Sequence, residues 1–154
     1  MRTKRPEATP TAYEPQTLRL GKGVVRRDGS DATIVAAGLC VAEALEAARV
    51  LEGDGIAVRV VDMASLKPFD ADLVLQCAAE TGAIVTAENH SIIGGLGSAV
   101  AEVLAEEGVG LPFRRVGIHD QFCEGGTTPY LMNKFGLDAI AIATAVRRVM
   151  EKKR

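Results

Sequence analysis

Residues 83–100 read AIVTAENHSIIGGLGSAV, and this stretch decides the fold class. The apolar run Ala83 to Ala87 has the length and composition of a buried β-strand. The polar residues 88–90 and the glycine-rich turn 94–97 follow it, and the segment after the turn has helical spacing. A strand that leads through a turn to the N-terminus of a helix is the building unit of α/β proteins. Such a turn lies at the carboxyl edge of the strands, where ligands and partners usually bind, so we expect them to bind near this turn.

The same unit recurs on both sides of this stretch. Short apolar strands are expected at 32–38, 57–63 and 113–118, and helices at 39–51, at 70–81, after the glycine turn, at 129–135 and from Asp138 onward. A weaker strand at 18–26 has two glycines and exposed charges, which suit a sheet edge. This alternation predicts a mostly parallel sheet with helices on both faces, and the 18–26 strand is the candidate for an antiparallel member.

The periodicity also predicts which helix faces are buried. In the 39–51 helix, Ala42, Leu45 and Ala48 are expected to pack, whereas Glu43 and Glu46 are expected to face solvent. The basic tail 151–154 is expected to be a solvated helix terminus rather than a binding patch, because cations are favoured beside the negative end of a helix.

The composition is that of a globular domain. The chain has 154 residues, 47% hydrophobic and 25% charged, which is enough to bury one core. A formal net charge of −2 and an aromatic content of 4% argue against nucleic acid as the main partner. Short apolar runs and the absence of a secretion signal argue against a membrane partner and predict a cytoplasmic location. The three widely spaced cysteines are expected to be reduced thiols.

The glycine turn raises the question of a nucleotide site. Gly95-Leu96-Gly97 approximates a dinucleotide fingerprint, but Val100 stands where the third glycine belongs and the turn comes late in the chain. Glycines that serve a tight turn and close helix packing explain the pattern better than a coenzyme does. An anion or partner contact at Gly94, Gly95 and Gly97 is the functional hypothesis that stays open.

Glu88 and His90 at the strand end suggest acid-base chemistry or pH sensing. Such a pair more often forms hydrogen bonds in a turn or an interface, and we favour that interpretation. His119 and Cys123 lack the converging ligands of a metal site and the oriented base of a nucleophile. Phosphate loops, nucleophile elbows and metal-ligand motifs are also absent, so the sequence predicts no catalytic residue and no metal ligand.

Several segments in register resemble the C-terminal domain of transketolases, including the C-terminal half of split bacterial forms. They are RTKRPEATPTAY, LGKGVVRRDGSDATIVAAG, VVDMASLKPFDADLV, TAENHSIIGGLGSAVAEVL and FGLDAIAIATAVRRV. The most specific pieces are residues 34–38, Leu66-Lys67-Pro68 with Asp70, the ENHSIIGGLGSAV block and residues 135–138. The resemblance covers practically all 154 residues in order.

The resemblance implies a three-layer α/β/α domain with a five-stranded mixed sheet that is mostly parallel and has one antiparallel edge strand. It implies part of a dimeric enzyme of the pentose phosphate pathway that transfers two-carbon ketol units between sugar phosphates. In that family thiamine diphosphate and a divalent cation such as Mg²⁺ are bound by the two preceding domains. A C-terminal domain of this kind supports assembly, needs its N-terminal and pyrimidine-binding partners for activity, and is inactive and without bound coenzyme by itself.

One substrate contact is carried over from the family. RTKRP resembles the end of the preceding pyrimidine-binding domain, where an arginine at the position of Arg5 contacts the substrate phosphate. A guanidinium fork matches phosphate oxygens, but this contact requires the preceding domain, so in this chain alone Arg5 is expected to be a linker charge. We therefore expect residues 1–16 to be a linker with the end of a missing domain, and residues 17–154 to be the transketolase C-terminal-like domain.

Two alternatives stay open. A free-standing anion-binding or regulatory module of the same fold would use the glycine turn with Glu88 and His90 to hold an anion or a partner. Homodimer formation alone is the third hypothesis.

Overall fold

The structure, a computed structural model, describes residues 19–153. The expected domain boundary after residue 16 and the expected phosphate contact Arg5 lie outside these residues. The strands are β1 (Val24–Arg27), β2 (Ala32–Ala36), β3 (Val58–Asp62), β4 (Ile84–Ser91) and β5 (Phe113–Ile118). The helices are α1 (Cys40–Glu52), α2 (Ala71–Thr81), α3 (Leu96–Glu106), α4 (Thr128–Lys134) and α5 (Ala139–Lys153). The order of strands and helices agrees with the sequence prediction.

The strands form one mixed sheet in the order β1-β3-β2-β4-β5. β2 pairs in parallel with β3 and β4, β5 pairs in parallel with β4, and β1 pairs antiparallel with β3. Parallel neighbours need crossover connections, which α1, α2 and α3 provide. The expectation of a mostly parallel sheet with one antiparallel edge strand is therefore confirmed.

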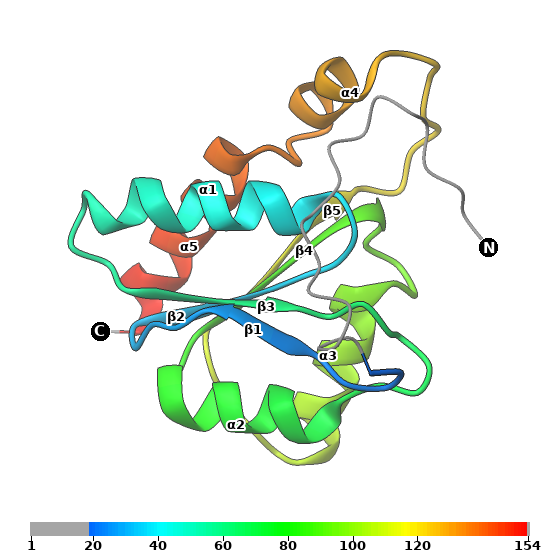
Figure 1. Ribbon diagram of the computed structural model, residues 1–154. Helices are drawn as coiled ribbons and strands as arrows, with labels where there is room; N and C mark the ends of the chain where they lie inside the picture. Colours follow the sequence, from blue (N-terminus) through cyan, green and yellow to red (C-terminus); the bar gives the residue numbers. More distant parts are fainter. Residues whose placement is uncertain (1–18, 154) are drawn as a thin grey trace.

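Helices cover both faces of the sheet, with α1 and α5 on one side and α2 and α3 on the other (Figure 1). Alternate strand residues serve two apolar cores. Ile34 and Val85 pack with α1 and α5, whereas Val35 and Ile84 pack with α2 and α3. Because the central strands are covered on both faces, they are apolar almost throughout. The three-layer α/β/α architecture is confirmed.

The loop 119–127 and α4 extend beyond this layered body (Figure 1), and we call residues 119–134 the arm. Met132 of α4 is buried and belongs to the core beneath α1 and α5. Phe122, in the loop of the arm, is fully exposed, and Tyr130 of α4 is half exposed. The arm is thus anchored through α4 while its loop offers aromatic surface to solvent.

The end of β4 differs from the expectation. The strand continues beyond Ala87 through the polar residues to Ser91, because the backbone goes on pairing with β5 as far as the Ser91–Ile118 register pair. The register is irregular between Ala87 and Ser91. An irregularity of this kind changes the alternation of side chains along the strand. The register irregularity therefore decides the directions in which the side chains of Glu88 and His90 point.

The buried face of α1 also differs from the expectation. Ala44 and Ala47 are buried, whereas Ala42 is exposed and Glu43 is half buried. The physical reason is a long-range contact, since Glu43 Oε2 accepts a hydrogen bond from the backbone N–H of Ala139 at 2.9 Å. Glu43 thereby binds the N-terminal turn of α5, and the buried face of α1 is rotated toward α5. The prediction for Ala48, which is buried, is confirmed.

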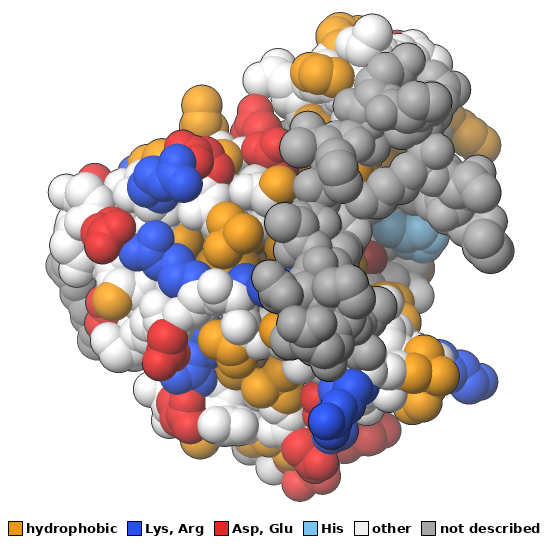
Figure 2. Space-filling model, in the orientation of Figure 1, with side chains coloured by type: hydrophobic (Ala, Val, Ile, Leu, Met, Phe, Trp, Pro, Cys, Tyr) orange, Lys and Arg blue, Asp and Glu red, His pale blue; other side chains and the backbone are white. Residues whose placement is uncertain are grey.

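Charged side chains of both signs lie next to one another on the face that Figure 2 shows. The ion pairs include Arg27 with Glu52, Arg49 with Glu46, Arg59 with Asp28 and Glu80, and Arg147 with Asp54. The pairs between exposed side chains, such as Arg49 with Glu46, contribute little stability, but each pair gives its arginine an acidic partner. Over residues 19–153, no helix has the length and apolar character needed to cross a membrane.

Residues 151–153 end α5 and are exposed, as expected for a solvated helix terminus, but the side chain of Lys153 also has partners in the fold. Its ammonium donates hydrogen bonds to the carbonyl oxygens of Asp31, at 2.8 Å, and Thr81, at 2.7 Å. These acceptors precede β2 and end α2. The end of α5 is therefore tied to two other parts of the fold.

Candidate functional site

Glu88 lies near the carboxyl end of β4, with its side chain buried against the N-terminus of α3. Its Oε2 accepts the backbone N–H of Leu96 and its Oε1 accepts that of Gly97, both at 2.8 Å. The first N–H groups of a helix have no partner within the helix, and the helix dipole favours negative charge there. Since Gly95 at the N-cap has no side chain to supply this contact, Glu88 acts as the cap of α3.

The glycines of the turn allow this close approach. A Cβ on Gly95 would overlap Glu88 Oε2 and would lie 2.7 Å from the carbonyl oxygen of Ser91. A Cβ on Gly97 would lie 2.7 Å from Arg115 Cδ. Both approaches are too short for a real side chain. The geometry therefore accords with glycines that serve close packing of the helix on the strand.

A ligand anion at this turn would need the same N–H groups. Those of Leu96 and Gly97 are already donated to Glu88, whose carboxylate would repel a second negative charge. Anion binding at Gly94, Gly95 and Gly97 stays a prediction, and the geometry disfavours it.

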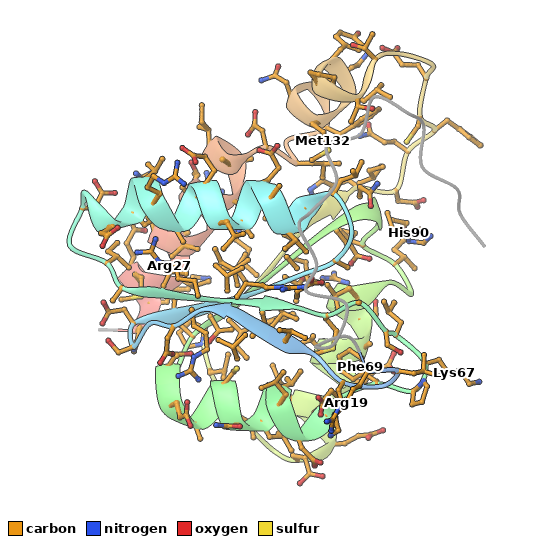
Figure 3. The ribbon with its side chains drawn as sticks, in the orientation of Figure 1. Arg19, Arg27, Lys67, Phe69, His90 and Met132 are labelled. Atoms are coloured by element: carbon orange, nitrogen blue, oxygen red, sulfur yellow. The ribbon has the colours of Figure 1, made fainter. Side chains whose placement is uncertain are left out.

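His90 projects from the end of β4 into solvent (Figure 3). Its Nδ1 lies 3.2 Å from the carbonyl oxygen of the neighbouring Ser91. Within the described residues, no hydrogen bond or ion pair joins His90 to Glu88, because the irregular end of β4 buries one and exposes the other. The structure does not bring them together as an acid-base pair, and a pH-sensing role stays a prediction.

The cysteines and His119 are also separated. His119 and Cys123 are exposed in the arm, while Cys40 and Cys77 are buried, and all three thiols are free. Burial raises the pKa of the Cys40 thiol to about 12, which makes it a poor nucleophile. In the part of the chain that the structure describes, no three His, Cys, Asp or Glu side chains converge as metal ligands.

The sequence analysis missed the partners of Asp70. Asp70 is at the N-cap position of α2, where the helix was expected to begin, and its carboxylate accepts hydrogen bonds from Lys22 Nζ at 2.9 Å and the Gly23 N–H at 3.0 Å. Burial alone would raise the pKa of Asp70, and these hydrogen bonds hold it below the ordinary value. The contact ties the segment before β1 to the start of α2. No local pattern announces it, because Lys22 and Asp70 are 48 residues apart.

The comparisons with known proteins agree on one family. Residues 21–142 match the family model of the transketolase C-terminal domain. The chain is 51% identical over 140 residues to a 6-deoxy-6-sulfo-D-fructose transketolase subunit from Clostridium sp. strain MSTE9. It is 45% identical over 139 residues to a 1-deoxy-D-xylulose-5-phosphate synthase from Syntrophotalea carbinolica. A solved structure described as a split gene transketolase, inactive beta4 tetramer, has 52% identity and a TM-score of 0.86.

These proteins are all longer than the region they share with this chain. The similarity covers 91%, 90% and 94% of this chain, respectively. The chain spans 43% of the Clostridium protein, 22% of the Syntrophotalea protein and 48% of the chain in the solved structure. The similarity therefore concerns one part of each larger protein.

Proposed function

This chain belongs to the transketolase C-terminal domain family, and from that premise we propose that it is the C-terminal section of a thiamine-diphosphate-dependent, transketolase-like enzyme. The complete enzyme transfers two-carbon ketol units between sugar phosphates, and this chain supports its assembly without catalytic groups of its own. The family match over residues 21–142 carries the proposal, because it runs from the segment before β1 into α5.

Ketol transfer is favoured over synthase chemistry by the Clostridium subunit and the split gene transketolase, which are 51% and 52% identical to this chain. The transketolase subunit from Clostridium is 51% identical to this chain, against 45% for the synthase from Syntrophotalea. The name of the Clostridium protein also supports a variant of the proposal in which the sugar carries a sulfonate in place of a phosphate.

Thiamine diphosphate and Mg²⁺ belong to the complete enzyme in this proposal. The described residues at the α3 N-terminus do not fit a diphosphate, because Glu88 already accepts two of the helix N–H groups at 2.8 Å. We therefore assign the coenzyme and cation to the N-terminal and pyrimidine-binding domains or subunit, within a dimer. Arg5 would contact the substrate phosphate only when those domains are present.

The arm supports a role in assembly. Phe122 is fully exposed and Tyr130 is half exposed, and both belong to residues 119–134. Aromatic side chains are enriched in the contact surfaces between proteins. In this proposal the arm contacts the partner domains or the second protomer.

The test combines the purified chain with a protein that supplies the N-terminal and pyrimidine-binding domains, in the presence of thiamine diphosphate and Mg²⁺. We expect transfer from a ketose phosphate to an aldose phosphate in the mixture and none with either protein alone. Turnover by the chain alone would contradict the proposal. A mixture that neither reacts nor forms a complex in sedimentation would contradict it as well.

The same preparation tests the alternatives. A titration with sugar phosphates and nucleotides, followed through the imidazole signal of His90, reports on the glycine turn. No perturbation by any of them argues against an anion-binding module. Monomers at high concentration would set aside homodimer formation by the chain alone.

A further inference from the structure

A groove lies along the outer edge of the sheet, between the edge strand β5 and helix α5. Its volume is about 280 Å³. The arginines 114, 115 and 148 line it together with His119, and no Asp or Glu does. Val116, Phe135, Ala141 and Ala145 contribute apolar surface. A groove whose charged lining is all basic stands out in a chain with a formal net charge of −2.

Two of these arginines lack the partners that other arginines have. Arg147 donates to Asp54 Oδ2 at 2.7 and 2.9 Å. Arg148, the next residue in the chain, has no hydrogen bond or ion pair to any of residues 19–153, and neither has Arg114. Both side chains are exposed. Their guanidinium groups are therefore available to an external anion, which a planar fork can bind bidentately.

Arg114 and Arg115 extend to opposite faces of the sheet, because side chains alternate along a strand. Arg115 donates to the carbonyl oxygen of Ile92 at 2.8 Å, on the side of α3. Arg114 has the parity of Val116, which packs in the core beneath α1 and α5. The positive head groups directed to the α5 side are therefore those of Arg114 and Arg148.

The backbone of β5 adds neutral donors to the groove. The carbonyl groups of Pro112 and Ile118 accept hydrogen bonds from the backbone N–H groups of Ile84 and Ile92, at 3.0 and 2.9 Å. The backbone polar groups of the even-numbered residues of β5 therefore point toward β4. The N–H and carbonyl groups of the odd-numbered residues then both face the open edge. Arg115 and Gly117 line the groove and contribute these outward N–H groups.

We propose that this groove binds a small phosphomonoester, with the phosphate between Arg114 and Arg148 and the carbon skeleton on the apolar surface of Phe135 and Ala141. The charge selects a dianion, and the outward N–H groups of β5 add hydrogen bonds to its oxygens. The volume of about 280 Å³ lies below that of drug-sized sites and limits the organic part to a short chain. This site does not depend on the proposed ketol transfer, and its test uses the chain alone.

The competing explanation is that the arginines protect the open edge of β5 against pairing with other strands. Charged side chains on edge strands commonly have this effect. The two explanations differ in outcome, because edge protection needs no saturable ligand and its loss promotes association of the chain.

The test follows the backbone amide signals of Arg115 and Gly117 by NMR during titration of the full chain. The probes are sn-glycerol 3-phosphate, inorganic phosphate and glycerol, at constant ionic strength. We expect saturable shifts with glycerol 3-phosphate, weaker binding of inorganic phosphate and no shift with glycerol. The variants Arg114→Gln and Arg148→Gln should each raise the dissociation constant at least ~5-fold, because each removes a charge-assisted contact.

Arg49→Gln is the matched control, because Arg49 is exposed on α1 and pairs with Glu46. Its dissociation constant should stay within about twofold of the wild-type value. Non-saturable shifts, or unchanged affinity in both groove variants, would overturn the site. Equal affinity for inorganic phosphate and glycerol 3-phosphate would overturn the assignment of the organic part. Association of the variants without ligand binding by the wild-type chain would establish edge protection instead.

Discussion

The Oε1 atom of Glu88 accepts the backbone N–H of Gly97 at 2.8 Å, which joins the end of β4 to the first turn of α3. The second carboxylate oxygen accepts the N–H of Leu96 at the same distance. The side chain thus satisfies two helix donors at once and places a negative charge at the positive end of the helix dipole. In the glycine turn, the N–H groups that could bind a ligand are therefore already bound by a side chain of the same chain.

Replacing Glu88 should destabilise the fold. Glu88→Ala leaves the two N–H groups buried without an acceptor, and we expect a loss of about 2–4 kcal/mol in the free energy of unfolding. Glu88→Gln keeps one oxygen acceptor and should lose less. Urea unfolding followed by circular dichroism measures both variants. Glu46→Gln, an exposed member of a surface pair, is the control and should change stability by less than about 0.5 kcal/mol. A Glu88→Ala variant as stable as this control would contradict the capping role.

Gly95→Ala should destabilise the protein through the same contact. Its Cβ would overlap Glu88 Oε2 and approach the Ser91 carbonyl oxygen to 2.7 Å. We expect a loss of about 2–4 kcal/mol, and a smaller loss when Glu88 is already Ala, because one of the two obstructions is gone. A double-mutant cycle measures this coupling. Gly110→Ala, whose Cβ would meet nothing within 4 Å, is the control. Strict additivity of Gly95→Ala and Glu88→Ala would show that the two residues do not interact.

The fold was predictable because its signals are local. The central strand β2 is a short apolar run, and the helix faces repeat within a few residues, as with Val100 and Leu104 in α3. The contacts that fix the site are not local. Glu88 reaches Leu96 across eight residues, Lys22 reaches Asp70 across 48, and Glu43 meets Ala139 across 96. A charged residue in a sequence does not reveal which distant helix end its side chain will bind.

Phe122 should matter for association and not for folding. Its side chain is fully exposed in the arm, so Phe122→Ser removes no buried contact and should leave the free energy of unfolding unchanged within about 0.5 kcal/mol. If the arm contacts the partner domains, the variant should weaken the complex by at least ~10-fold in sedimentation or titration experiments. Val50→Ser, partly exposed on α1, is the control. Equal complex affinity of wild type and Phe122→Ser would exclude the aromatic surface from the interface.

The three thiols should differ sharply in reactivity. Cys123 is exposed, whereas Cys40 and Cys77 are buried and burial raises the pKa of Cys40 to about 12. A disulfide reagent at pH 8 should therefore modify one thiol of the folded chain quickly and all three in denaturant. Cys123→Ser should remove the fast phase. Fast modification of two thiols in that variant would mean that the helix layers open readily.

Asp70 should make stability depend on acid. Its folded-state pKa lies below the ordinary value, since hydrogen bonds from Lys22 and Gly23 outweigh the effect of burial. A lowered pKa contributes stability above the unfolded pKa, about 4, and the contribution disappears as the pH falls through the folded pKa. Asp70→Asn should therefore cost about 1–3 kcal/mol at pH 7 and progressively less below about pH 4, because the unfolded wild-type carboxyl takes up its proton at a higher pH than the folded one. Urea unfolding between pH 7 and pH 3 measures the difference. Asp72→Asn is the control, because that side chain is 94% exposed and lies 3.9 Å from Lys22. A deficit of Asp70→Asn that is the same at pH 7 and pH 3 would show that the charge of Asp70 does not stabilise the fold.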